Sequence, residues 1–218
     1  ELSERLNIDP SKIEVMVPLA VPAPRGNPSQ AELEHVRRKY ALPEHFILMI
    51  GTVEPRHNHQ AVFAALADAA SPAGVVVCGR RTAWSDYLLG YARARRIAAR
   101  VDFIYELTPS DLPALFRLAR VFAYLPDADA EASVVPVVEA LRAGLPMVLS
   151  DTQVNREAAG EAAAYVRPEA RGEVLAALEN ALEDVSWRRT MQERERRRAE
   201  LFSEYAVAER LMQIYTAL

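Results

Sequence analysis

Two basic side chains, Arg56 and His57, stand between a short apolar run and a helical pattern that begins near residue 58. Gly51 lets the chain turn sharply away from the apolar run, and Asn58 is a residue type that caps helix N-termini. A helix N-terminus carries unpaired N–H groups and the positive end of the helix dipole, so it attracts anions. The pattern therefore predicts a binding site for a diphosphate. The alternative is an ordinary surface loop with a capped helix and an exposed arginine.

A second pair of cations, Arg80 and Arg81, follows another apolar run that ends at Cys78 and Gly79. If this run is a strand of a parallel sheet, both guanidinium groups stand at its carboxyl end, where ligands bind. They could contact phosphate oxygens there. Surface arginines are more often simply solvated, so both interpretations stay open.

Two acidic residues, Glu131 and Glu139, have seven residues between them. Glu131 falls in a predicted loop, and Glu139 falls about one turn into a helix whose first turn contains Pro136. Apolar residues flank Glu139, and a carboxylate in such surroundings is costly unless it has partners. Carboxylate oxygens accept hydrogen bonds from hydroxyl groups, so the pair could bind a sugar and a ribose. Alternatively, Glu139 faces solvent and Glu131 is an ordinary loop acid.

Short apolar runs alternate with helical patterns along most of the chain, and such runs are typical of strands buried on both faces of a sheet. We expect strands at 46–50, 74–78, 101–104, 121–124 and 147–149, with a short one near 163–165. We expect helices at 29–42, 58–70, 85–98, 110–118 and 136–143. This alternation predicts an α/β fold, a Rossmann-like doubly wound parallel sheet with helices on both faces and a helical C-terminal tail over 170–218.

The expected fold also decides where a ligand would bind. Loops at the carboxyl ends of parallel strands meet at one edge, which selects 51–58, 79–84, 105–110 and 125–136. Residues 1–28 contain several prolines near their end and are predicted to be a linker, followed by one domain over 29–218. The chain starts at Glu1 without a methionine, so we expect further residues upstream.

Composition excludes several classes of function. The chain has 218 residues and a formal net charge of −4, which gives no electrostatic basis for binding nucleic acid. Cys78 is the only cysteine, so an intrachain disulfide is excluded and a reducing compartment is expected. No apolar run approaches the roughly 20 residues that span a bilayer, and the N-terminus does not resemble a signal peptide. The histidines lack metal-ligand spacing. We therefore expect a cytoplasmic protein without a metal.

The order of these motifs resembles the C-terminal domain of retaining glycosyltransferases of family 4, the group 1 glycosyl transferases, which have the GT-B architecture. Residues 51–58 resemble the family's Gly-Thr-x-Glu-Pro-Arg-Lys-Asn loop, and Glu131 to Glu139 falls where its Glu-x7-Glu motif belongs. The segments 77–81, 101–116 and 140–148 match the family in the same order. Because several motifs are colinear over residues 10 to 218, the set is more specific than any one of them.

The resemblance implies that this chain is the donor-binding half of an enzyme whose acceptor is held by an N-terminal domain absent from the chain. The enzyme would transfer a sugar from a GDP- or UDP-sugar, with GDP-mannose preferred, to a glycan or lipid-linked acceptor with retention of configuration. Such a mannosyltransferase activity would belong to bacterial polysaccharide or lipopolysaccharide assembly. No metal or other cofactor is implied, because positive side chains would stabilise the departing diphosphate.

The resemblance also implies roles for individual residues. Arg56 would pair with the diphosphate and Glu131 would hold the donor sugar, so these two are the expected catalytic residues. Glu139 would bind the ribose hydroxyls. The other implied donor-binding positions are Gly51, Thr52, His57, Arg80, Arg81, Ser133, Val134 and Val135.

Some residues depart from the family pattern and support a second hypothesis. Glu-Gly-Phe-Gly is replaced by residues 131–134, Glu-Ala-Ser-Val, and the lysine beside the phosphate is replaced by His57. Glycines there would let the backbone approach the donor closely. The alternative function is a degenerate, catalytically inactive binding or scaffold module. A third hypothesis is a nucleotide-sugar epimerase of similar architecture.

The C-terminal tail contains an arginine-rich stretch over residues 188–198. Such a stretch could contact the anionic inner face of the plasma membrane, which would suit a lipid-linked acceptor. Glu193 and Glu195 are interspersed with the arginines, which favours a solvated helix face with ion pairs four residues apart.

Overall fold

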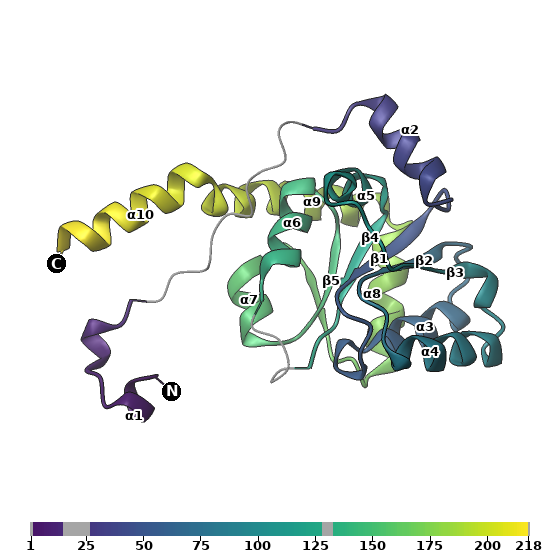
Figure 1. Cartoon of the computed structure of the whole chain (residues 1–218), viewed down its shortest axis with the longest axis horizontal. Coiled ribbons are helices and arrows are strands. Elements are labelled where there is room, and N and C mark those ends of the chain that lie inside the picture. Colours follow the sequence, from purple (N-terminus) through teal and green to yellow (C-terminus); the bar gives the residue numbers. More distant parts are fainter. Residues whose placement is uncertain (1, 15–26, 128–132, 218) are drawn as a thin grey trace.

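The computed structural model describes residues 2–14, 27–127 and 133–217. A six-stranded parallel sheet with strand order β3-β2-β1-β4-β5-β6 lies at its centre, which confirms the predicted fold (Figure 1). Its strands are β1 (Phe46–Ile50), β2 (Gly74–Cys78), β3 (Val101–Ile104), β4 (Val121–Tyr124), β5 (Met147–Ser150) and β6 (Ala164–Val166). The strand order reverses between β1 and β4, and ligand sites of doubly wound sheets lie at such a reversal.

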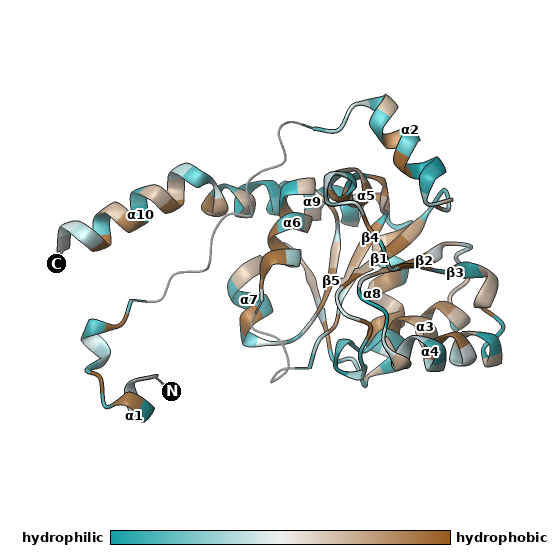
Figure 2. Ribbon diagram, viewed as in Figure 1, coloured by the Kyte–Doolittle hydropathy of each residue, from teal (hydrophilic) through white to brown (hydrophobic). Residues whose placement is uncertain are grey.

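The inner strands are apolar because helices cover both faces of the sheet (Figure 2). Phe46 and Leu48 of β1 pack into the core on one face, and Ile47 and Met49 pack into the core on the other. The edge strand β3 differs, since Asp102 in its middle is exposed. Burial on both faces therefore accounts for the continuous apolar runs of the strands that end at the candidate site.

One layer of helices contributes to the core that contains Phe46. This layer consists of α2 (Gln30–Lys39), α5 (Leu112–Leu118), α6 (Val135–Ala143) and α7 (Gln153–Ala159). The opposite layer consists of α3 (His59–Asp68), α4 (Ala83–Ala94) and α8 (Arg171–Glu183). Figure 1 shows α3 and α4 on the side of the sheet opposite α5 and α6. Helix α7 was not among the predicted elements.

Local hydrogen bonds set the ends of these helices. Ser29 caps α2 as predicted, and Glu32 completes a capping box with it. The helix predicted at 85–98 begins instead at Ala83, because the Thr82 hydroxyl accepts a hydrogen bond from the N–H of Trp84 at 3.1 Å. The helix predicted at 110–118 begins at Leu112, since residues 109–111 form a 3-10 turn.

The predicted helical tail is confirmed and consists of separate pieces. Helix α8 is followed by α9 (Val185–Ala199), the 3-10 turn η5 (Glu200–Phe202) and α10 (Glu204–Ala217). Helix α10 extends away from the sheet, and its Tyr205 and Tyr215 are 77% and 65% exposed (Figure 1). Arg210 of α10 pairs with Glu14. The segment predicted as a linker contains α1 (Leu2–Leu6) and the 3-10 turn η1 (Pro10–Lys12).

The arginine-rich stretch lies in α9, and part of it serves packing. Arg188 donates to the Leu182 carbonyl at the end of α8, and Arg198 donates to the Ala158 carbonyl at the end of α7. Glu195 is fully buried, so the prediction of a solvated helix face is wrong at this residue. The exposed arginines of the stretch include Arg189, Arg196 and Arg197. Within the described residues, no helix is long and apolar enough to cross a membrane.

Candidate functional site

The loops after β1 and β2 are in backbone contact at the carboxyl edge of the sheet. The N–H of Gly51 donates to the Cys78 carbonyl at 3.0 Å, and the N–H of Val53 donates to the Arg80 carbonyl at 3.1 Å. A Cβ atom on Gly79 would lie 1.8 Å from the carbonyl oxygen of Gly51, so this approach requires glycine. The two loops therefore form a single backbone platform.

The loop after β1 is also joined to the loop after β4. The N–H of Asp127 donates to the Arg56 carbonyl at 2.9 Å. The side-chain amide of Asn58 donates to the Leu125 carbonyl at 2.9 Å and to Oδ1 of Asp127 at 2.6 Å. Asn58 occupies the N-cap position of α3 but its side chain makes no capping bond, so its predicted capping role is wrong. Its amide bridges two loops instead, which brings the ends of β1, β2 and β4 together.

Arg56 lies in the 3-10 turn η2 (Pro55–His57) on this platform. Its Nε donates to Oε2 of Glu54 at 2.6 Å, and the guanidinium holds the pKa of that carboxyl below its usual value. The Arg56 side chain is 38% exposed. The site therefore presents an arginine that pairs with a neighbouring acid and that solvent-borne anions can reach.

His57 points inward from the same turn. The ring is 5% exposed, and its Nδ1 lies 2.6 Å from the carbonyl oxygen of Thr52. Its centroid lies 6.0 Å from the ring of His59 and 6.4 Å from the ring of Tyr124. Burial lowers the pKa of His59 to about 4, so that second imidazole is neutral at pH 7.

Arg80 and Arg81 follow β2 on the other side of the platform, and both are exposed. Arg81 Nη2 donates to Oδ1 of Asp86 at 2.8 Å, and its guanidinium lies 5.7 Å from the centre of the Tyr105 ring. A shallow cavity of about 440 Å³ is lined by the residues that end β2 and β3, 78–81 and 104–107. The structure thus brings both predicted arginines to the carboxyl edge of the sheet.

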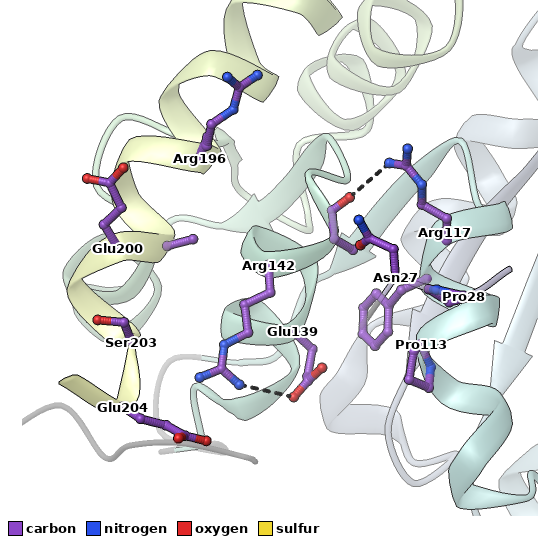
Figure 3. Close-up of a pocket in the computed structure, with 13 residues that line it drawn as sticks. Asn27, Pro28, Pro113, Arg117, Glu139, Arg142, Arg196, Glu200, Ser203 and Glu204 are labelled. Carbon is purple, nitrogen blue, oxygen red and sulfur yellow. Dashed lines mark hydrogen bonds and ion pairs between the residues drawn. The ribbon is translucent and has the colours of Figure 1, made fainter. Parts of the chain in front are cut away.

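Glu139 lies in the second turn of α6 and faces a different cavity. It is 6% exposed, and burial raises the pKa of its carboxyl group while Arg142 opposes that rise. Its Oε1 has no hydrogen-bond partner among the described residues, and Arg142 Nη1 lies 3.9 Å away. Both side chains line a cavity of about 670 Å³, together with residues of α5, α9, η5 and the start of α10. Figure 3 shows them pointing toward one another in this cavity.

That cavity and the platform have different lining residues. Its lining includes Pro113 and Phe116 of α5 and Glu204 of α10. Among the described residues that line it, none comes from 51–58 or 79–82. The structure therefore groups Arg56, His57 and the two arginines after β2, and it places Glu139 on the neighbouring helix with its carboxylate toward a second hollow.

The loop that leads into α6 is described from Ser133 onward. Glu131 and Ala132 lie outside the described residues. Ser133 is exposed, and its carbonyl accepts a hydrogen bond from the Tyr124 hydroxyl at 3.4 Å. Val134 is 4% exposed and packs in the core, whereas Val135 is 40% exposed at the first position of α6.

Sequence reasoning missed three residues that shape this region, Asp127, Tyr124 and Arg142. The signal for Arg142 was present, because residues three apart on a helix are neighbours and an arginine three after Glu139 can reach it. Asp127 and Tyr124 act through contacts between segments that are distant in sequence. Within the described part of the chain, no group of three or more histidine, cysteine, aspartate or glutamate side chains could hold a metal ion.

The chain is similar to known proteins in sequence and in fold. The family described as "Glycosyl transferases group 1" matches residues 32–198. The "O-antigen chain mannosyltransferase B" of Escherichia coli is 29% identical over 181 residues, which cover 80% of this chain and 47% of that protein. The chain therefore spans about half the length of this curated relative.

Two solved structures have the same fold. The C-terminal domain of a glycosyl transferase group 1 family protein (LpcC) from Francisella tularensis aligns with a TM-score of 0.68 and 14% identity, covering 82% of this chain and 94% of that one. Anabaena HepE in complex with UDP aligns with a TM-score of 0.77 and 16% identity, covering 88% of this chain and 54% of that one.

Proposed function

Because this chain belongs to the glycosyl transferases group 1 family, we propose that it supplies the nucleotide-sugar site of a retaining hexosyltransferase. The observation that carries the proposal is the platform formed by the loops after β1, β2 and β4, which presents Arg56 at the reversal in strand order. Ligands of doubly wound sheets bind at this point. The HepE structure with UDP, which shares the fold, also supports a nucleotide ligand.

Arg56 would stabilise the leaving group. Negative charge grows on the diphosphate as the bond to the sugar breaks, and a cation already in place lowers the free energy of that transition state. Guanidinium groups suit phosphate because they donate several parallel hydrogen bonds. The contact with Glu54 would orient Arg56 before the ligand arrives, so that little reorganisation is needed during the reaction. Arg80 and Arg81 would add positive potential at the same edge.

The two glutamates would bind the sugar parts of the donor. Glu131 would hold the transferred sugar, and Glu139 would accept hydrogen bonds from ribose hydroxyls. The Oε1 atom of Glu139, buried and without a hydrogen-bond partner in the described residues, supports this role, because such an atom gains most from a hydroxyl donor. The backbone around Ser133, Val134 and Val135 and the turn at Gly51 and Thr52 would complete the contact surface.

The similarity to an O-antigen mannosyltransferase favours GDP-mannose as the donor and a glycan or lipid-linked molecule as the acceptor. The acceptor would be bound mainly by an N-terminal domain. The exposed arginines of α9 would lie near an anionic membrane surface when the acceptor is lipid-linked. Bacterial polysaccharide or lipopolysaccharide assembly on the cytoplasmic face of the membrane is the process that this activity would serve.

Calorimetric titration with UDP, GDP and ADP tests the donor site directly. We expect selective binding of GDP or UDP, and a loss of at least about tenfold in affinity in Arg56→Ala, since an arginine–phosphate pair contributes more than one ordinary hydrogen bond. Arg171→Ala is the matched control. Arg171 is an exposed arginine at the start of α8, and it pairs with Asp68 at the end of α3. Equal affinity of Arg56→Ala and the control would overturn the role of Arg56.

A scaffold module is the second candidate function, and one observation favours it. Val134 fills the core where the family carries a glycine, so the backbone there is covered by a side chain. A scaffold would bind nucleotide but transfer no sugar. Sugar transfer by the longer protein, measured with GDP-mannose and an acceptor glycan and abolished by Glu131→Gln, would exclude the scaffold.

A further inference from the structure

The imidazole of His57 closes the loop that carries Arg56. Its Nδ1 meets the carbonyl of Thr52, five residues earlier, at 2.6 Å. A carbonyl oxygen only accepts hydrogen bonds, so Nδ1 carries the proton and donates it. The ring also lies close to Gly51, because a Cβ atom added to Gly51 would lie 3.3 Å from Cε1 of His57. The ring of His57, at the end of this loop, therefore contacts Gly51 and Thr52, where the loop begins.

The same ring lies near the carboxyl ends of β1 and β4. It faces the Tyr124 ring at the end of β4 with centroids 6.4 Å apart, and the edge of the neutral His59 ring at 6.0 Å. The Arg56 carbonyl, next to His57 in the chain, accepts the N–H of Asp127 from the loop after β4. The position of Arg56 is therefore fixed from both sides, by a backbone bond to one loop and by the ring within its own.

We infer that His57 is a positioning residue that holds Arg56 in place, and that it does not act as a phosphate-binding cation. The inference rests on the proposed function for the role of Arg56. A cation that binds phosphate must present its charge to the ligand, whereas His57 is only 5% exposed and directs its Nδ1 into the loop. Arg56, at 38% side-chain exposure, is the group of this turn that a diphosphate can reach.

Nitrogen-15 NMR of the imidazoles tests the geometry without any ligand. The chain has four histidines, so a long-range spectrum is simple, and His57→Asn assigns the His57 signals. We expect Nδ1 of His57 to carry a proton, because it lies 2.6 Å from the Thr52 carbonyl oxygen. An Nδ1 without a proton would overturn the inference whether or not nucleotides bind.

Two amide substitutions test the role in binding. Asparagine places its amide near the position of Nδ1 and can still donate to the Thr52 carbonyl, whereas glutamine places it near Nε2 and cannot. We expect His57→Asn to bind GDP or UDP within about threefold of the native chain, and His57→Gln to bind about tenfold more weakly, the worth of one hydrogen bond of roughly average strength. Equal losses in both variants, or tighter binding by His57→Lys than by His57→Asn, would show that charge matters instead.

A double-mutant cycle with Arg56→Ala links the two residues. If His57 acts through Arg56, His57→Gln costs little additional affinity once Arg56 is gone. Losses that simply add would contradict the inference. If the native chain binds no nucleotide at all, the proposed function fails, while the NMR result still decides how the loop is held.

Discussion

Glu139 and Arg142 face one another one turn apart on α6, with Oε1 and Nη1 separated by 3.9 Å. The same arginine donates from Nη2 to the carbonyl of Phe202 in η5 at 2.8 Å. Burial raises the pKa of Glu139, and the positive charge of Arg142 acts in the opposite direction. The ionisation of the glutamate that we assign to the ribose therefore depends on one neighbouring side chain.

Replacing Arg142 with glutamine should raise the pKa of Glu139 further. Because the carboxyl group protonates as pH falls, nucleotide affinity that depends on its ionised form should be lost at a higher pH in Arg142→Gln than in the native chain. Calorimetric titrations with GDP or UDP between pH 5 and pH 8 measure this shift. Glu139→Gln is the control, since it should remove this part of the pH dependence. Identical pH profiles for the native chain and Arg142→Gln would contradict the coupling.

Gly79→Ala should destabilise the chain because its new Cβ atom would overlap the Gly51 carbonyl. We expect a loss of about 1–3 kcal/mol in the free energy of unfolding, the usual cost of overpacking. Gly90→Ala is the matched control, because nothing lies within 4 Å of a Cβ atom there and Gly90 is inside α4. That control should gain about 0.5–1 kcal/mol from helix propensity. Urea unfolding measures both, and equal effects of the two substitutions would refute the close contact.

Glu195 should make the chain less stable as pH rises. Its oxygens have no hydrogen-bond partner among the described residues, and burial raises its pKa to about 8. The unfolded chain releases the proton near the ordinary glutamate pKa of roughly 4.3, so folding stability falls between that pH and about 8. Glu195→Gln removes this ionisation and should be more stable than the native chain at pH 8, by on the order of 2–4 kcal/mol.

The same measurement has an internal control on α9. Glu193 is exposed on the same helix, so Glu193→Gln controls for the loss of a glutamate from α9. Urea unfolding at pH 5 and pH 8 for the native chain and both variants gives the comparison. If the unfolding free energy of Glu195→Gln changes with pH as much as that of the native chain, Glu195 is ionised or hydrogen-bonded in the folded state.

The strands and the edge where the site lies could be predicted because burial on both faces leaves a clear sequence pattern. The runs at 46–50 and 74–78 became β1 and β2 with the predicted bounds. The position of the arginines that come after these strands could be predicted as well, because the carboxyl ends of parallel strands lie at one edge of the sheet. Such positions depend on local pattern and on general rules of sheet topology.

The contacts that orient the side chains could not be predicted. Asparagine is a residue type that often caps helices, so the sequence predicts that Asn58 caps α3. Its side-chain amide donates instead to the Leu125 carbonyl, which belongs to a loop 67 residues away in the sequence. Glu195 looked solvated because arginines surround it in sequence, and the packing of α9 buries it. Whether His57 points outward or into its own loop depends on the space beside Gly51, which one sequence does not reveal.

The contact between Gly79 and the Gly51 carbonyl also affects how sequences of this family should be compared. A glycine at the Gly79 position is required by the neighbouring backbone, whatever the protein binds. Members that have lost catalysis would be under the same selection to keep it, since any side chain there would disturb the fold itself. Retention of this glycine across an evolutionary lineage would therefore carry information about inherited architecture, whereas under the proposed function the side chains at positions 56, 57 and 139 would be the better markers of surviving activity.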